Sequence, residues 1–322
     1  MSTHVYGPVP SRRLGRSLGI DVTPPLPNKT CNFNCVYCQL GRTRHFTNQR
    51  REFFPLEKLL KETRKRIEVV GIENIDYLTC VGDGEPTLYS KIGELISSFK
   101  ETWDLPVCVI TNGALLYSEK VRKELLHADL VMPTLDAGTE EEFKRINRPI
   151  RHINFEKMIK GMILFSKSYT GKIWMEFMAL RGVNDNYDSL IKTRDIYAQI
   201  NPDRIFVNTP IRPTPEDWAR TPTLENMDLI QKILEPTAKE GLVAINFSEQ
   251  GDFFIEGEKE ADIIKNLILT IKRHPMQLNQ VQTVLERKKM RHPEEILKKI
   301  LEQNIQQKEF RGKIFFSYYE HR

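Results

Sequence analysis

The run Lys29-Thr-Cys-Asn-Phe-Asn-Cys-Val-Tyr-Cys-Gln-Leu-Gly41 places three cysteines, Cys31, Cys35 and Cys38, at the spacing Cys-x3-Cys-x2-Cys. Three thiolates on one short loop can hold three irons of a [4Fe-4S] cube, which leaves the fourth iron without a protein ligand. That open iron is free to coordinate a small molecule. The spacing therefore predicts an iron-sulfur cluster with one reactive corner rather than a disulfide.

A structural zinc site is the alternative interpretation, with His45 as a fourth ligand. Closed zinc sites usually carry two tight ligand pairs, whereas this loop has a triplet and a distant histidine. The other two cysteines, Cys80 and Cys108, lie inside apolar runs, where a free cysteine behaves as a small hydrophobic residue. We expect both to be buried, so that too few cysteines remain for a second cluster.

Length and composition describe an ordinary globular protein. The 322 residues allow one α/β domain of about 250 residues and an appendage of about 60. The chain has no uninterrupted apolar run of about 18 residues that would span a bilayer. Its first residues lack the charged start and apolar stretch of a signal peptide. We therefore expect a cytoplasmic protein with no membrane contact.

Short β-rich runs alternate with longer amphipathic stretches between residues 18 and 208. The expected strands are Leu18–Val22, Asp76–Val81, Leu105–Thr111, Leu130–Leu135, Lys172–Leu180 and Arg204–Asn208. The expected helices are Leu56–Val70, Lys91–Thr102, Ser118–His127, Asn154–Ser168 and Tyr187–Gln199. Repeated βα units predict a parallel sheet. Six units are too few for a closed eight-stranded barrel, so we expect an α/β fold with a partial (βα)6 barrel and its site at the carboxyl ends of the strands.

The chain changes character at about residue 258. Residues 259–322 contain 14 Lys or Arg against 8 Asp or Glu, so the net positive charge of the chain belongs to this segment. Its pattern predicts three helices, then two β-like runs over residues 308–319 that turn at Arg311-Gly312; the helices are Ala261–Arg273, Gln277–Arg287 and Pro293–Gln303. Three helices and a hairpin resemble a winged-helix module. We thus expect a barrel domain over 1–258 and a winged-helix-like basic domain over 259–322, which either contacts nucleic acid or only closes the barrel.

If the second domain contacts nucleic acid, its basic side chains supply the phosphate contacts. The candidates are Arg287, Lys288, Lys289 and Arg291, with Arg311 and Lys313 at the hairpin turn. Six βα units already complete the catalytic layer, so we expect the barrel to assemble its cofactor site without residues 259–322.

The turn Gly82-Asp-Gly-Glu-Pro-Thr87 follows the second expected strand. Glycines at a strand end let the backbone approach a ligand closely, and Glu85 adds a charge that can face an ammonium group. A plain strand-to-helix turn is the alternative. Two further strand ends carry small polar side chains suited to ribose hydroxyls, namely Thr111, Asn112, Thr134 and Asp136, although helix caps use the same residue types.

Two charged features lie near the expected site. Glu176 stands among apolar residues of the fifth expected strand, where an unpaired carboxylate is costly. It needs either a buried basic partner or the substrate. Arg12, Arg13 and Arg16 precede the first expected strand and either grip a phosphate or carboxylate of the substrate or form a solvated face.

The cysteine spacing, with Tyr37 directly before the last cysteine, resembles the signature of the radical S-adenosylmethionine (SAM) superfamily. The turn containing Gly84 and Glu85 resembles that family's Gly-Gly-Glu motif, which receives the SAM amino group, with Asp83 in place of a glycine. The resemblance implies that SAM chelates the open iron and that an electron from the cluster cleaves it to a 5'-deoxyadenosyl radical. It also implies a reduced flavodoxin or ferredoxin type electron donor and SAM contacts from Tyr37, Gly84, Glu85, Thr111, Asn112 and Thr134. The catalytic residue that handles the substrate stays unassigned.

Several further segments narrow the resemblance. The opening residues 6–19, Arg145-Ile-Asn-Arg-Pro149, Gly182-Val-Asn-Asp185 and Asn208-Thr-Pro-Ile-Arg-Pro213 resemble radical SAM iron-sulfur oxidoreductases related to the wyosine tRNA-modification synthases. An N-terminal cysteine set for a second cluster is missing, which argues against tricyclisation of a tRNA base. The implied activity is radical chemistry on a nucleic acid or nucleotide. The alternatives are an activase that places a radical on a glycine of a partner enzyme, and a redox-sensing iron-sulfur protein that binds nucleic acid.

Overall fold

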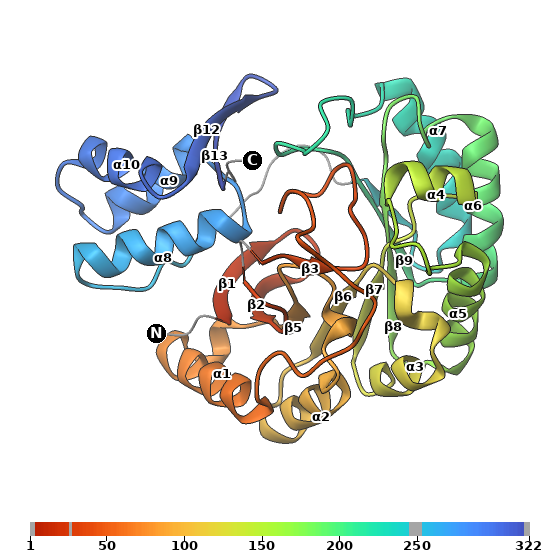
Figure 1. Ribbon diagram of the computed structural model, residues 1–322, viewed down its shortest axis with the longest axis horizontal. Coiled ribbons are helices and arrows are strands. Elements are labelled where there is room, and N and C mark those ends of the chain that lie inside the picture. The colour runs from red at the N-terminus through yellow and green to blue at the C-terminus, as the bar shows by residue number, and fades with distance from the viewer. Residues whose placement is uncertain (1–3, 26–27, 245–252, 319–322) are drawn as a thin grey trace.

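The computed structural model describes residues 4–25, 28–244 and 253–318. Its central feature is a curved sheet with the strand order β1-β2-β5-β6-β7-β8-β9-β10 (Figure 1). The strands are β1 (Val5–Ser11), β2 (Gly15–Asp21), β5 (Tyr77–Val81), β6 (Val107–Thr111), β7 (Leu130–Pro133), β8 (Lys172–Met178), β9 (Arg204–Asn208) and β10 (Leu242–Ala244). From β2 to β10 every neighbouring pair is parallel, while β1 is antiparallel to β2. The α/β class and the open parallel sheet expected from the sequence are confirmed.

Seven helices of the described chain connect the parallel strands, and they lie on the outer side of the sheet (Figure 1). They are α1 (Leu56–Val70), α2 (Ile92–Thr102), α3 (Glu119–Leu125), α4 (Glu140–Ile146), α5 (Phe155–Ser168), α6 (Tyr187–Ile200) and α7 (Leu224–Leu234). Four of them begin at a side-chain cap, in which Thr139, Asn154, Asn186 or Thr223 accepts a hydrogen bond from a backbone N–H of the first turn. Short 3₁₀ turns at Ile72–Asn74, Pro86–Leu88, Ala114–Tyr117 and Glu235–Thr237 complete the connections.

The sheet is wider than the six strands expected, because a strand is added at each edge. β1 was not among the expected strands, and its sequence Val-Tyr-Gly-Pro-Val-Pro-Ser contains two prolines. Proline lacks a backbone N–H, but it is tolerated at a sheet edge, where β1 lies. β10 has only three residues, too few for a readable alternation of apolar and polar side chains.

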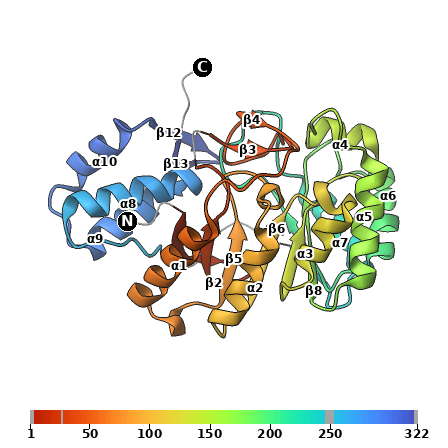
Figure 2. The same ribbon diagram turned by 60° about the horizontal axis from the view of Figure 1, so that its bottom comes forward.

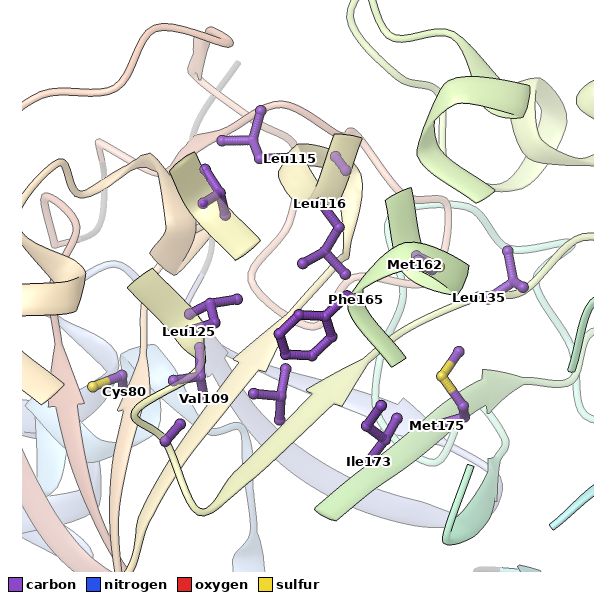
Figure 3. Packing of buried hydrophobic residues seen from close by; sticks show 14 of the residues in the cluster. Cys80, Val109, Leu115, Leu116, Leu125, Leu135, Met162, Phe165, Ile173 and Met175 are labelled. Atoms are coloured by element: carbon purple, nitrogen blue, oxygen red, sulfur yellow. The ribbon is translucent and has the colours of Figure 1, made fainter. Parts of the chain in front are cut away.

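The main hydrophobic core lies between the sheet and its helices (Figure 3). In the close view, Phe165 of α5 lies between Leu116, in the turn after β6, and the strands that carry Val109 and Ile173. Cys80 and Cys108 are fully buried free cysteines, as expected from their apolar neighbours. The core therefore leaves the strand ends as the place where polar side chains gather.

Residues 253–318 build a second core beside β1 (Figure 1). The elements are α8 (Glu260–Arg273), β11 (Met276–Gln277), α9 (Leu278–Arg287), α10 (Pro293–Leu301), β12 (Ile305–Phe310) and β13 (Lys313–Tyr318). The expected hairpin turns at Arg311-Gly312, where both residues have positive φ; Tyr319, at the end of the expected run, lies outside the described residues. β11 adds a third strand, and assignment to the winged-helix class stays a prediction.

The second core includes Phe253 and Ile255, which precede residue 258, and Val9 of β1 packs against it. The boundary at residue 258 stays a prediction. Within the described ranges, no helix is both long enough and apolar enough to cross a bilayer.

Candidate active site

A cavity of about 400 Å³ opens at the carboxyl ends of the parallel strands. The cysteine loop lies over this edge of the sheet, with its short parallel strands β3 (Thr30–Cys31) and β4 (His45–Phe46) above β5 and β6 (Figure 2). Most residues predicted to form the site line this one cavity: Cys31, Cys35, Tyr37, Cys38, Gly84, Glu85, Thr111, Asn112, Thr134, Glu176, Arg12 and Arg13. The prediction that the cluster loop and the strand ends share one site therefore agrees with the geometry.

Each cysteine sulfur of the loop accepts a hydrogen bond from the protein. Lys29 Nζ donates to Cys38 Sγ at 3.1 Å and to the Gly41 carbonyl at 2.6 Å. Asn112 Nδ2 lies 3.7 Å from Cys31 Sγ, and the buried Asn147 places its Nδ2 3.6 Å from Cys35 Sγ. Donors aimed at sulfur stabilise thiolate charge and tune a cluster that the thiolates hold.

The charge of Lys29 depends on the cysteines. The residue is 2% exposed, and burial opposes its charge, but neighbouring Cys38 and Cys31 outweigh burial and raise the pKa of the Lys29 ammonium. Burial raises the pKa of Cys31 to about 12, an effect that the Lys29 ammonium counteracts. A buried ammonium beside three thiols fits an anionic cluster, because it supplies the opposite charge where water is excluded.

The donor set fits a [4Fe-4S] cluster better than a single zinc ion. No three His, Cys, Asp or Glu side chains in the described ranges are grouped to hold one metal ion, and His45 is exposed. A cube needs each thiolate at a different iron, so the sulfurs do not converge on one point. The zinc interpretation with His45 as the fourth ligand therefore has no support in the geometry.

Gly84 is required by the protein's own backbone rather than by ligand approach alone. A Cβ at this position would lie 1.7 Å from the Thr30 carbonyl oxygen. The next residue, Glu85, donates its backbone N–H to that same oxygen at 3.1 Å. The turn is thereby joined directly to the cysteine loop, which explains why a glycine precedes the acidic residue.

The Glu85 carboxylate organises the neighbouring strand ends. It is 1% exposed; Oε1 accepts from Thr87 N at 3.0 Å and from Thr111 Oγ1 at 2.6 Å, while Oε2 accepts from Asn112 N at 2.7 Å. Burial raises the pKa of Glu85, and these hydrogen bonds oppose the rise. Sequence reasoning predicted a carboxylate facing a ligand and missed its contacts within the protein.

Asp136 differs from the other predicted polar residues because it does not line the cavity. Its Oδ2 accepts from Tyr37 OH at 2.6 Å and from Asn147 Nδ2 at 2.7 Å, and Oδ1 accepts from Met178 N at 2.8 Å. Asp136 thus holds the Tyr37 ring and the Asn147 amide that reaches Cys35. Its expected contact with a ribose is replaced by this supporting role.

The three N-terminal arginines separate into two groups. Arg12 and Arg13 line the cavity, and Arg13 forms the ion pair that the buried Glu176 requires. Arg16 instead pairs with Asp76 at 2.8 Å just before β5, at the opposite end of the strands, with half of its side chain exposed. The expected site-facing role therefore applies to Arg12 and Arg13 only.

The C-terminal segment also reaches this edge of the sheet. Arg273, the last residue of α8, is buried between Asp21 and Asp83, with Nε 3.6 and 3.8 Å from their carboxylate oxygens. Its guanidinium also lies over the Tyr6 ring. Asp83 stands where the Gly-Gly-Glu motif has a glycine, and its carboxylate is the one that lies beside Arg273. This contact argues against a barrel that is independent of residues 259–322.

Three functional residues were missed by sequence reasoning: Lys29, Asn147 and Arg273. Lys29 alone had a visible signal, since it adjoins the cysteine loop. Asn147 lies in the run Arg145–Pro149 that was noted only as a resemblance, and its contact with Cys35 crosses 112 residues. Arg273 gave no signal in the sequence, because basic residues are common in the last turn of a helix.

Comparisons with known proteins agree on one family. The sequence pattern of the Radical SAM superfamily matches residues 26–193, more than half of the chain. "UPF0026 protein MJ1312" from Methanocaldococcus jannaschii is 34% identical over 314 residues, which cover 98% of this chain and 95% of that protein. "GTPase Obg" from Brachyspira hyodysenteriae is 37% identical over 298 residues, 92% of this chain but 42% of that protein. The chain thus spans less than half the length of this second relative.

A solved structure shares the fold. The structure of TYW1 with a lysine-pyruvate adduct bound superposes with a TM-score of 0.51 and 16% sequence identity, covering 69% of this chain and 74% of that chain. At this identity the likeness concerns the fold, and it supports the partial barrel.

Proposed function

Because the chain belongs to the radical SAM superfamily, as its cysteine spacing predicted, we propose that Cys31, Cys35 and Cys38 hold a [4Fe-4S] cluster beside a SAM site. Members of this superfamily are enzymes that use the cluster and SAM. When bound, the two groups supply a 5'-deoxyadenosyl radical that removes a hydrogen atom from a substrate. The observation that carries the proposal is the hydrogen bond that each cysteine sulfur accepts, from Asn112, Asn147 or Lys29, at the wall of one cavity.

The chain's own residues would orient SAM in this cavity. Tyr37, Gly84, Glu85, Thr111, Asn112 and Thr134 remain the proposed contacts. A reduced flavodoxin or ferredoxin is the proposed electron donor. The direct test of the function is formation of 5'-deoxyadenosine from SAM by the anaerobically reconstituted protein.

We expect Glu85→Gln to weaken SAM binding more than cluster assembly. The glutamine amide has an NH2 group in place of one carboxylate oxygen, so it can no longer accept all the hydrogen bonds that Glu85 accepts. It also lacks the negative charge that would face the ammonium group of SAM. A charge-assisted hydrogen bond contributes roughly 1.5 to 3 kcal/mol, so SAM affinity should drop about 10- to 100-fold. Calorimetric titration of SAM into protein of known iron content measures this.

Glu94→Gln is the matched control, because Glu94 is an exposed residue of α2 that pairs with Lys91. It should leave SAM affinity unchanged. Wild-type SAM affinity in a Glu85→Gln protein with full iron content would remove Glu85 from the binding site.

A nucleic acid is the proposed substrate class, and a basic groove favours it. Two surface hollows adjoin the cavity: the first shares Arg212 with the cavity, and the second shares Phe310 and Arg311 with the first. The basic residues that line the two hollows are Arg181, Arg212, Arg220, Lys308, Arg311 and Lys313, against the acidic Asp217 and Glu309. A basic path with aromatic Phe310 and Phe315 suits a single strand that enters the cavity.

We expect single-stranded RNA to bind with a strong salt dependence, because each neutralised phosphate releases counterions. Changing Arg311 and Lys313 together to Gln should reduce the slope of log affinity against log salt by about 1.4, at roughly 0.7 per phosphate contact. Changing Lys123 and Lys144 to Gln removes the same charge at two exposed positions outside the groove. Fluorescence anisotropy over a salt series measures both variants. Equal salt slopes in the groove variant and the control variant, or no RNA affinity at low salt, would contradict RNA binding by the groove.

Two other interpretations leave parts of the site without a role. A redox sensor does not need the polar strand ends or the cavity that continues from the cysteines. An activase for a glycyl-radical enzyme uses the cavity but leaves the basic groove unexplained.

A further inference from the structure

Of the described side chains that donate to the cysteine sulfurs, Lys29 alone carries a charge. It directly precedes β3, and its Nζ reaches across the cysteine loop to Cys38 Sγ at 3.1 Å and to the Gly41 carbonyl at 2.6 Å. The other two donors are neutral amides that lie farther from their sulfurs, at 3.7 Å for Asn112 and 3.6 Å for Asn147. The loop therefore places one positive charge in contact with one of the three proposed cluster ligands.

The protein fixes the position of this ammonium. The Lys29 carbonyl accepts hydrogen bonds from Arg44 N at 3.2 Å and from His45 N at 2.9 Å, beside the pairing of β3 with β4. Cys38 and Gly41 hold the other end of the side chain, and the residue is buried. A lysine that is anchored at both ends and shielded from water keeps its charge at a fixed distance from the sulfur.

No carboxylate of the described chain forms an ion pair with Lys29. Its ammonium has two hydrogen-bond partners there, a sulfur and a carbonyl oxygen. A buried charge is costly unless an opposite charge lies close to it. The thiolates of Cys31, Cys35 and Cys38 are the negative groups that this loop can offer. The charge of Lys29 therefore acts on the group that these sulfurs hold.

A buried positive charge shifts the reduction potential of a neighbouring cluster in one direction. Reduction of a [4Fe-4S] cluster adds one electron, with no bond formed or broken, so the cluster and its thiolates gain one negative charge. A nearby ammonium stabilises this reduced form more than the oxidised form. Net charge, hydrogen bonds to the sulfurs and solvent exposure are the properties through which a protein sets such a potential. Lys29 contributes a charge and a hydrogen bond at a site shielded from solvent.

We propose that Lys29 raises the reduction potential of the cluster held by Cys31, Cys35 and Cys38 and thereby favours the electron transfer that precedes SAM cleavage. The electron comes from the carrier protein in the proposed function and from europium(II) in the test below. This inference rests on the proposed function, and it assigns to Lys29 the control of the first step. Lys29 acts through the Cys38 sulfur, so its effect is expected in the potential itself.

The test is a potentiometric titration of the full-length, anaerobically reconstituted protein in the absence of SAM. Europium(II) reduces the cluster stepwise, and the electron paramagnetic resonance signal of the reduced cluster reports its fraction at each potential. Lys29→Met removes the charge and both hydrogen bonds of the side chain. Lys29→Gln offers an uncharged donor in their place, and Lys29→Arg keeps the charge. The three variants therefore separate the effect of the charge from that of the hydrogen bond.

We expect the equilibrium constant for reduction to fall about 10- to 100-fold in Lys29→Met and Lys29→Gln, the range of a charge-assisted hydrogen bond. At about 59 mV per tenfold change for one electron, the potential should fall by about 60 to 120 mV. Lys29→Arg should stay near the wild-type potential. If Lys29→Met fails to hold a cluster, Lys29→Gln still carries the test.

Arg42→Gln is the matched control for the charge. Arg42 is a cation of the same loop, but its side chain is 56% exposed and pairs with Glu216 at 3.4 Å. Solvent and salt screen an exposed charge of this kind. The potential of Arg42→Gln should therefore equal that of the wild type.

Four results would overturn the assignment. Wild-type potentials in both neutral variants would show that the charge of Lys29 does not act on the cluster. A fall in Lys29→Met alone would assign the effect to the hydrogen bond, and an equal fall in Arg42→Gln would remove its dependence on burial. If neither neutral variant holds a cluster, Lys29 serves cluster assembly instead.

The proposed function is judged separately on the wild type. A wild-type protein without cluster absorbance or 5'-deoxyadenosine formation rejects the proposed function. A loaded and active wild type, with unchanged potentials in the neutral variants, rejects the role of Lys29 alone.

Discussion

Replacing Cys31, Cys35 or Cys38 with alanine should abolish the broad iron-sulfur absorbance at about 400 nm after anaerobic reconstitution. Each sulfur has its own donor in the folded protein, from Asn112, Asn147 or Lys29, so no cysteine is spare. The two cysteines that remain cannot hold a [4Fe-4S] cluster that needs three protein ligands. The measurement is the absorbance spectrum together with the iron and sulfide content per chain.

Cys80→Ala and Cys108→Ala are the matched controls, because both residues are fully buried in the core away from the loop. Each should keep the full absorbance. A folded Cys80→Ala protein without a cluster, or a Cys35→Ala protein with full iron content, would contradict the ligand assignment.

Replacing Arg273 with methionine should destabilise the protein by about 3 to 5 kcal/mol, the usual cost of removing one partner from a buried ion pair. The change leaves Asp21 and Asp83, which are 1% and 4% exposed, without the guanidinium between them. Because Asp83 lies in the turn that carries Gly84 and Glu85, SAM affinity should fall as well. Denaturant unfolding of the reconstituted protein measures the stability.

The pH dependence gives this prediction a second readout. Burial and Asp83 raise the pKa of Asp21 to about 7 in the folded protein. Between the ordinary Asp pKa near 4 and this value, the folded state binds more protons than the unfolded state, so stability falls as pH rises. Without Arg273 the folded pKa should rise further, and the loss between pH 5.5 and pH 8 should be larger than in the wild type.

Lys272→Met is the control for the Arg273 change. It removes a cation from the same turn of α8, but its ammonium lies over the Tyr318 ring rather than between the carboxylates. Wild-type stability and an unchanged pH slope in Arg273→Met would show that α8 is not coupled to the turn Gly82–Thr87.

Much of the barrel was predictable because its signals are local. Each βα unit repeats a short apolar run and an amphipathic stretch, and Leu56–Val70 and Arg204–Asn208 were predicted with the bounds observed. The cysteine triplet and the Gly82–Thr87 turn are also contiguous in sequence. Local patterns of this kind survive folding because neighbouring residues determine them.

The rest of the site depends on contacts between distant segments, which no local pattern contains. Arg273 meets Asp83 across 190 residues, and Arg212 meets His274 across 62. The sequence also does not show in which direction a side chain points. Glu85 accepts hydrogen bonds from Thr111 and Asn112 at the end of β6. Arg16 points away from the site that Arg12 and Arg13 line.

The most direct test of the account is the fate of SAM in the presence of the reconstituted protein and a strong reductant under anaerobic conditions. The account predicts 5'-deoxyadenosine, detected by chromatography and mass spectrometry, from the wild type and from Cys80→Ala. It predicts none from Cys35→Ala. A wild-type protein with full iron content that binds SAM but forms no 5'-deoxyadenosine above the Cys35→Ala background would contradict the proposed function.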